Sequence, residues 1–161
     1  ARGRGLPRAH RPAEAVRRLI VPDVNLLLYA TDETSPFFER AHGWWSHCLN
    51  GREPVGLCHV VLFAFLRLST NPRVFEAPLR LEEAEDIVQT WLDRRVTRVL
   101  LPEVEHHERV LALLRAAGAT TGHLVTDAQI ASLAVAHRGE VHTADQDFRR
   151  FPDVRCRYPL V

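Results

Sequence analysis

Three aspartates stand out because each lies beside a short apolar run. Asp23 ends Leu-Ile-Val-Pro-Asp, Asp127 lies in Leu-Val-Thr-Asp-Ala-Gln-Ile-Ala, and Asp145 follows Val-His-Thr-Ala. A carboxylate beside a hydrophobic core is costly unless a positive charge compensates it, and Mg²⁺ or Mn²⁺ prefers such oxygen ligands. A cation held between grouped acids can activate water and neutralise the charge on a phosphodiester. The leading hypothesis is therefore a metal-dependent hydrolytic site.

The elements that would position these acids alternate between strand and helix. Apolar runs predict strands over residues 18–23, 54–58, 96–101 and 140–143, and leave 154–157 as an optional fifth. Helical spacing predicts helices over residues 36–49, 60–69, 81–94, 103–117 and 127–137, and residues 24–29 favour a first helical turn or an apolar loop. This alternation predicts an α/β sandwich with a mostly parallel sheet of four or five strands. Sites in such sheets lie at the carboxyl ends of the strands, where we expect the three acids to converge.

Each acid also has an ordinary structural explanation. Asp127 is placed as the N-cap of a helix that begins there, and Asp145 and Asn25 suit turns. The combination favours a site more strongly than any one residue does, because three separate strand ends would each present an acid to one edge of the sheet.

Length and composition indicate one domain with a hydrophobic core. The chain has 161 residues, of which 46% are hydrophobic. It contains no apolar run of membrane-spanning length and no continuous secretory stretch, so we expect a soluble, cytoplasmic protein without a membrane partner. Cys48, Cys58 and Cys156 lack Cys-x-x-Cys spacing, which indicates reduced packing residues, with neither a disulfide framework nor a zinc site implied.

The charge is uneven although the net charge is +1, because residues 1–18 carry six arginines against the single acid Glu14. We therefore divide the chain into a basic N-terminal arm, residues 1–17, and one globular domain, residues 18–161. Three interpretations of the arm stay open: a natural segment that touches phosphates, a remnant of cloning, and an unstructured leader.

Four segments together resemble a known family. Val-Pro-Asp-Val-Asn at 21–25, Phe-Leu-Arg-Leu-Ser-Thr-Asn-Pro at 65–72, Thr-Asp-Ala-Gln-Ile-Ala at 126–131 and Val-His-Thr-Ala-Asp-Gln-Asp-Phe at 141–148 are similar to the ordered motifs of PIN-domain ribonucleases, specifically VapC-type toxins of bacterial type II toxin–antitoxin pairs. The resemblance covers about residues 18–158. It implies a Rossmann-like three-layer α/β/α sandwich, Mg²⁺- or Mn²⁺-dependent endonucleolytic cleavage of RNA, a homodimer, and inhibition by a small cognate antitoxin.

The resemblance assigns roles to individual residues. It implies that the catalytic and metal-binding acids are Asp23, Asp127 and Asp145, and that the supporting residues are Asn25, Thr143 and Asp147. Arg67 and Arg149 are candidates for binding RNA phosphates, although a local ion pair for Arg67 and a solvated surface position for Arg149 are open alternatives.

One position departs from the family pattern. A glutamate is expected on the helix after the second strand, and Ala64 stands there. Either Asp147 or the Asp32–Glu33 loop replaces this acid, or three acids suffice together with water ligands. A catalytically degenerate module that binds RNA or its antitoxin is the alternative function.

Overall fold

A computed structural model describes residues 18–161, which form a five-stranded sheet with six α-helices. The fold class is confirmed as α/β. The basic arm expected over residues 1–17 lies outside the described residues.

The five strands are short and all parallel, and the optional fifth strand is present. They are β1 (Ile20–Pro22), β2 (Val55–Cys58), β3 (Thr97–Leu100), β4 (Glu140–His142) and β5 (Cys156–Arg157), in the order β3-β2-β1-β4-β5. Every residue of β1 and β2 is buried, as expected for central parallel strands covered on both faces.

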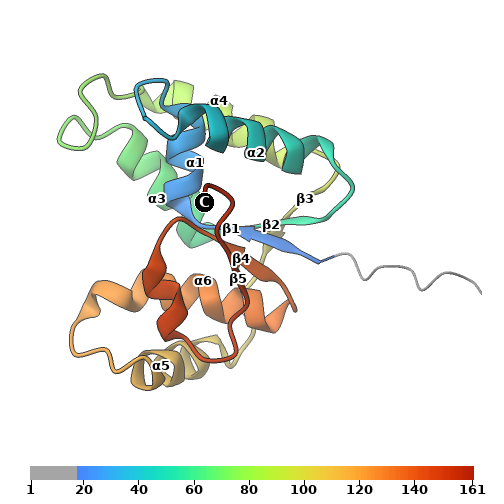
Figure 1. The fold of residues 1–161 in the computed structure, drawn as a ribbon, viewed down its shortest axis with the longest axis vertical. Helices are drawn as coiled ribbons and strands as arrows, with labels where there is room; N and C mark the ends of the chain where they lie inside the picture. The colour runs from blue at the N-terminus through green and yellow to red at the C-terminus, as the bar shows by residue number, and fades with distance from the viewer. Residues whose placement is uncertain (1–17) are drawn as a thin grey trace, which may run out of the picture.

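Helices cover both faces of this sheet. Figure 1 shows α1 (Val24–Thr31), α2 (Phe38–Asn50), α3 (His59–Ser69) and α4 (Leu81–Leu92) on one face, and α5 (His106–Ala116) and α6 (Val125–Ala136) on the other. The short 3-10 helix η1 (Gly122–Leu124) precedes α6, and a second one, η2 (Gln146–Arg150), follows β4. Within residues 18–161, no helix has the length and apolar character needed to cross a membrane.

The order of the strands creates a switch point between β1 and β4. The chain proceeds from β1 outward through β2 to β3, then returns to the other side of β1 and continues through β4 to β5. Ligand sites of open parallel sheets lie at such a point, outside the carboxyl ends of the strands. The amide of Asp23 donates to the carbonyl of His142 over 2.8 Å, so the chain segments leaving β1 and β4 start side by side.

Candidate active site

Asp23 lies at the carboxyl end of β1 and is 3% exposed. One carboxylate oxygen, Oδ1, accepts a hydrogen bond from the amide of Val24 over 2.7 Å and caps α1. The other, Oδ2, accepts a hydrogen bond from the Thr143 hydroxyl over 2.7 Å. Both oxygens are thus oriented by neighbours, which satisfies a polar group that would otherwise be costly to bury.

The loop after β4 brings the second acid to the same place. The fully buried Thr143 hydroxyl accepts a hydrogen bond from the amide of Asp145 over 2.9 Å, and the Asp145 carboxylate accepts one from the amide of Asp147 over 2.8 Å. Asn25 ties this loop to α1, because its side-chain oxygen accepts from the amide of Ala144 over 3.4 Å. Thr143 therefore links Asp23 to Asp145 directly.

Asp127 reaches the site in a different way from the one predicted. It lies within the first turn of α6, which begins at Val125 after η1, and the N-cap position belongs to Leu124. The expectations that Asp127 is an N-cap and that it follows a strand are both wrong. The sheet positions Asp23 and Asp145, whereas α6 presents Asp127 from beside the sheet.

The electrostatics show that these acids share one environment. Burial, together with the negative charges of Asp23, Asp145 and Asp147, raises the pKa of Asp127 to about 7. Burial also raises the pKa of Asp23 to about 6, against the opposing hydrogen bonds from Thr143 and Val24. Without a cation, Asp127 and Asp23 therefore keep their protons to a higher pH than ordinary aspartates do.

The donor atoms of the candidate site decide which metal ion it suits. All donors are carboxylate, amide or hydroxyl oxygens, the chemistry that Mg²⁺ and Mn²⁺ select. Within residues 18–161, however, no group of three or more histidine, cysteine, aspartate or glutamate side chains is arranged closely enough to hold a metal ion. The donor chemistry therefore fits such a cation, but a complete ligand set requires the carboxylates to turn toward one another.

Of the residues considered as replacements for the missing acid at Ala64, Asp147 is best placed, because its charge acts on Asp127. Asp32 is the C-cap of α1 and Asp23 is its N-cap, so their backbones lie at opposite ends of the helix, about 13 Å apart along its axis. Together with Glu33, Asp32 lines a separate hollow with Ser69.

The two predicted RNA-binding arginines have different surroundings. Arg67 is exposed on α3 and lines a groove together with Ala64 and residues of α6. Arg149 is exposed on η2, and its guanidinium carbon lies 5.0 Å from the centroid of the Tyr158 ring. Arg67 is therefore the better placed of the two to approach a ligand beside Asp127.

This groove, which we call the α3–α6 groove, was not predicted from the sequence. It has a volume of about 430 Å³ and is lined by Val60, Phe63, Ala64, Arg67, Thr126 and Gln129. The spacing of its α3 residues at 60, 63, 64 and 67 is a helical face and was visible in the sequence. Nothing in the sequence indicated that α6 would lie opposite that face.

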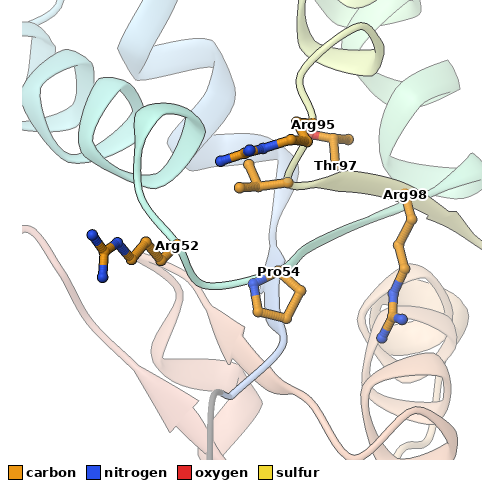
Figure 2. Close-up of a pocket in the computed structure, with 6 residues that line it drawn as sticks. Arg52, Pro54, Arg95, Thr97 and Arg98 are labelled. Atoms are coloured by element: carbon orange, nitrogen blue, oxygen red, sulfur yellow. The ribbon is translucent and has the colours of Figure 1, made fainter.

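A second cavity lies at the opposite end of the sheet, where β2 and β3 begin. It has a volume of about 680 Å³, and its lining includes Arg52, Arg95 and Arg98. Figure 2 shows Arg52 and Arg98 on either side of Pro54, with Arg95 above them. Its lining contains arginines and no acid among the described residues, so this cavity is not the candidate active site.

Comparison with known proteins agrees with this geometry. The PIN domain family matches residues 20–154 of the chain. The chain belongs to the PIN-domain family and, within it, to the VapC ribonucleases. Ribonuclease VapC33 of Mycobacterium tuberculosis is 40% identical over 142 residues, which cover 88% of this chain and 99% of the relative.

Solved structures show the same fold at lower sequence identity. VapBC2 from Rickettsia felis, bound to a promoter DNA fragment, matches with a TM-score of 0.62 and 16% identity over 86% of this chain and 97% of that one. VapC20 of Mycobacterium tuberculosis, a toxin that cleaves the sarcin–ricin loop, matches with a TM-score of 0.61 and 17% identity over 84% of this chain and 98% of that one.

Proposed function

We propose that this chain is the toxin of a toxin–antitoxin pair and cleaves RNA endonucleolytically with Mg²⁺ or Mn²⁺. The observation that carries the proposal is the buried Asp23 at the switch point of the sheet, in an environment shared with Asp127 and Asp145. The similarity to Ribonuclease VapC33 supports RNA as the substrate class.

In this proposal Asp23, Asp127 and Asp145 hold the cation, with Asp147 near enough to contribute. A divalent cation there would supply an activated water and neutralise charge on the scissile phosphodiester. Water molecules can complete its coordination, since Mg²⁺ usually keeps several of them. This tolerance accommodates alanine at position 64.

The chain's own residues orient these acids. Thr143 donates to Asp23 and accepts from the amide of Asp145, so one hydroxyl fixes the Asp23 carboxylate relative to the backbone of Asp145. Asn25 holds the loop that carries Asp145 against α1. Asp127, whose pKa is about 7, binds a proton near neutral pH until a cation replaces it.

The test is cleavage of purified RNA with Mg²⁺, Mn²⁺ or EDTA. Asp23→Asn, Asp127→Asn and Asp145→Asn should each lower the rate by more than about 100-fold, beyond the usual cost of losing an outer partner of a metal ligand. The matched control is Asp86→Asn, at an exposed acid of α4. Cleavage that persists in the three variants would contradict the assignment. Metal-independent RNA binding without cleavage would support the degenerate binding module instead.

The partners we propose are a small antitoxin and a second copy of the chain. The support for an antitoxin is the similarity of the fold to VapBC2 of Rickettsia felis, whose structure was solved bound to a fragment of promoter DNA. Light scattering of the purified chain tests the homodimer, and co-purification with the product of a neighbouring small gene tests the antitoxin. Because RNA is the proposed substrate, we propose that the chain acts in the cytoplasm.

A further inference from the structure

The α3–α6 groove adjoins the candidate active site. Its α6 wall is made by Thr126 and Gln129, which flank Asp127 in the sequence. Its volume of about 430 Å³ falls within the roughly 300–1,000 Å³ typical of ligand sites. A ligand in the groove would therefore lie against the turn of α6 that carries Asp127.

The groove carries an exposed aromatic platform. Phe63 is 65% exposed, whereas Phe65, two residues further along α3, is fully buried. The Phe63 ring stacks on His59, with centroids 5.9 Å apart and planes inclined by 12°. The two rings are nearly parallel, and exposed aromatic faces are where proteins stack the bases of single-stranded nucleic acids.

The rest of the lining complements the other parts of a nucleotide. Arg67 supplies a positive charge and makes no ion pair within residues 18–161. Thr126 and Gln129 offer hydroxyl and amide groups that can donate to and accept from a base edge. The described lining contains no acid that would repel a phosphate.

We propose that the α3–α6 groove receives one unstacked base of the RNA substrate, beside the phosphate that is cleaved. The base stacks on Phe63, and Arg67 pairs with a neighbouring phosphate. This inference rests on the proposed function and adds a subsite to it. Ala64 gains a role here, because its small side chain lies in the lining where a larger one would take up the space.

A protein segment is a weaker candidate for the same groove. Stable protein interfaces bury about 800 Å² on each partner, centred on several apolar anchors. Here three apolar residues, of which Phe63 is the one large exposed side chain, and three polar residues, Arg67, Thr126 and Gln129, surround a limited volume beside the turn of α6 that carries a candidate acid for phosphodiester chemistry. That combination matches a base and its phosphate more closely.

The experiment measures binding of a short single-stranded RNA that carries 2-aminopurine at successive positions. Asp145→Asn is the parent, so that cleavage does not interfere. Adding Phe63→Leu should weaken binding about tenfold, because it keeps an apolar side chain but removes the ring. It should also abolish the fluorescence change at one position. Phe63→Trp should preserve both signals, and Leu111→Ala, at an exposed apolar residue of α5, should change neither.

Equal RNA affinity and equal fluorescence in the Phe63→Leu and parent proteins would overturn the inference. Loss of antitoxin capture in Phe63→Leu with unchanged RNA binding would overturn it too, in favour of a protein-docking surface. A failure of the proposed function gives a different result. In that case the chain with its native Asp145 would cleave no RNA with either metal. In the cleaving protein, Phe63→Leu should raise KM and leave the dependence on Mg²⁺ concentration unchanged.

Discussion

At the scale of single residues, the site depends on how Thr143 connects its neighbours. Its hydroxyl donates to one aspartate and accepts from the backbone of another, and it is fully buried. Since both hydrogen bonds of this hydroxyl involve an acid of the candidate site, the side chain serves the geometry of the site as well as the packing beneath it.

Thr143→Val should therefore destabilise the protein near neutral pH. Valine has nearly the same shape but cannot donate to Asp23, which leaves a buried carboxylate oxygen without its partner at a cost of about 1–3 kcal/mol. Urea unfolding measures this loss, and Thr143→Ser, which keeps the hydroxyl, should lose less. Equal stability of Thr143→Val and the unaltered chain would mean that the hydrogen bond contributes nothing.

The cation-free protein should become less stable as pH rises from about 4 to about 7. The folded-state pKa values are about 6 for Asp23 and about 7 for Asp127, against an ordinary value of 3.8. In this window the folded chain keeps protons that the unfolded chain has released, so raising the pH favours unfolding. Calorimetry in EDTA should show Tm falling across the window.

Two controls separate this effect from a general pH dependence. Asp127→Asn should flatten the upper part of the profile, because the group with the higher pKa is removed. Mg²⁺ should raise Tm most near neutral pH, where the carboxylates are charged and can bind it. A profile that is the same with and without Asp127 would contradict the assigned cause.

At the scale of elements, α3 determines what faces Asp127. Ala64 lies on the α3 face that opposes the first turn of α6, so a longer side chain at this position would extend toward the acids. Ala64→Glu should bind Mg²⁺ about tenfold more tightly, which corresponds to about 1.4 kcal/mol. It should also lower the stability of the cation-free protein, because it adds a like charge.

Calorimetric titration with Mg²⁺ or Mn²⁺ measures this change. Ala64→Gln is the matched control, since it fills the same space without charge and should leave cation affinity unchanged. Both variants should weaken RNA binding in the α3–α6 groove. Identical cation affinity for the Glu and Gln variants would place position 64 outside the reach of the metal.

The elements themselves were largely predictable, because apolar runs and helical spacing alternate clearly. The packing of these elements against one another was harder to predict from the sequence. The sequence around Asp127 suits a cap, but η1 starts the helical path earlier and moves Asp127 inside the first turn. Apolar spacing could not separate the exposed Phe63 from the buried Phe65, because that difference depends on where α6 and Trp91 pack.

At the scale of the whole molecule, charge is divided between the two ends of the sheet. Asp23 and Asp145 lie beyond the carboxyl ends of β1 and β4, and the cavity lined by Arg52, Arg95 and Arg98 lies where β2 and β3 begin. Partners that approach the two ends therefore meet opposite fields.

We expect an antitoxin to place an arginine or lysine among the acids and so displace the cation. The purified complex should then bind Mn²⁺ much more weakly than the free toxin in a calorimetric titration. Asp23→Asn should weaken antitoxin binding, because it removes a carboxylate that the basic side chain would pair with. A complex that binds Mn²⁺ as tightly as the free chain, yet cleaves no RNA, would show that inhibition works elsewhere.

Asp23 and Asp145 each cap the element that follows them, whereas Asp127 lies inside a helical turn and caps nothing. A mutation at codon 23 or 145 that deletes the side chain therefore removes folding stability together with any activity, and cells clear such chains quickly. Asp127→Asn instead relieves charge repulsion in a chain that stays folded. If the proposed function is right, the inactive but folded Asp127→Asn protein would accumulate in the cell. It would then compete with active toxin for the antitoxin that both bind. The position of the inactivating mutation would then decide whether the mutated gene is harmless or harms the cell by withdrawing antitoxin from active toxin.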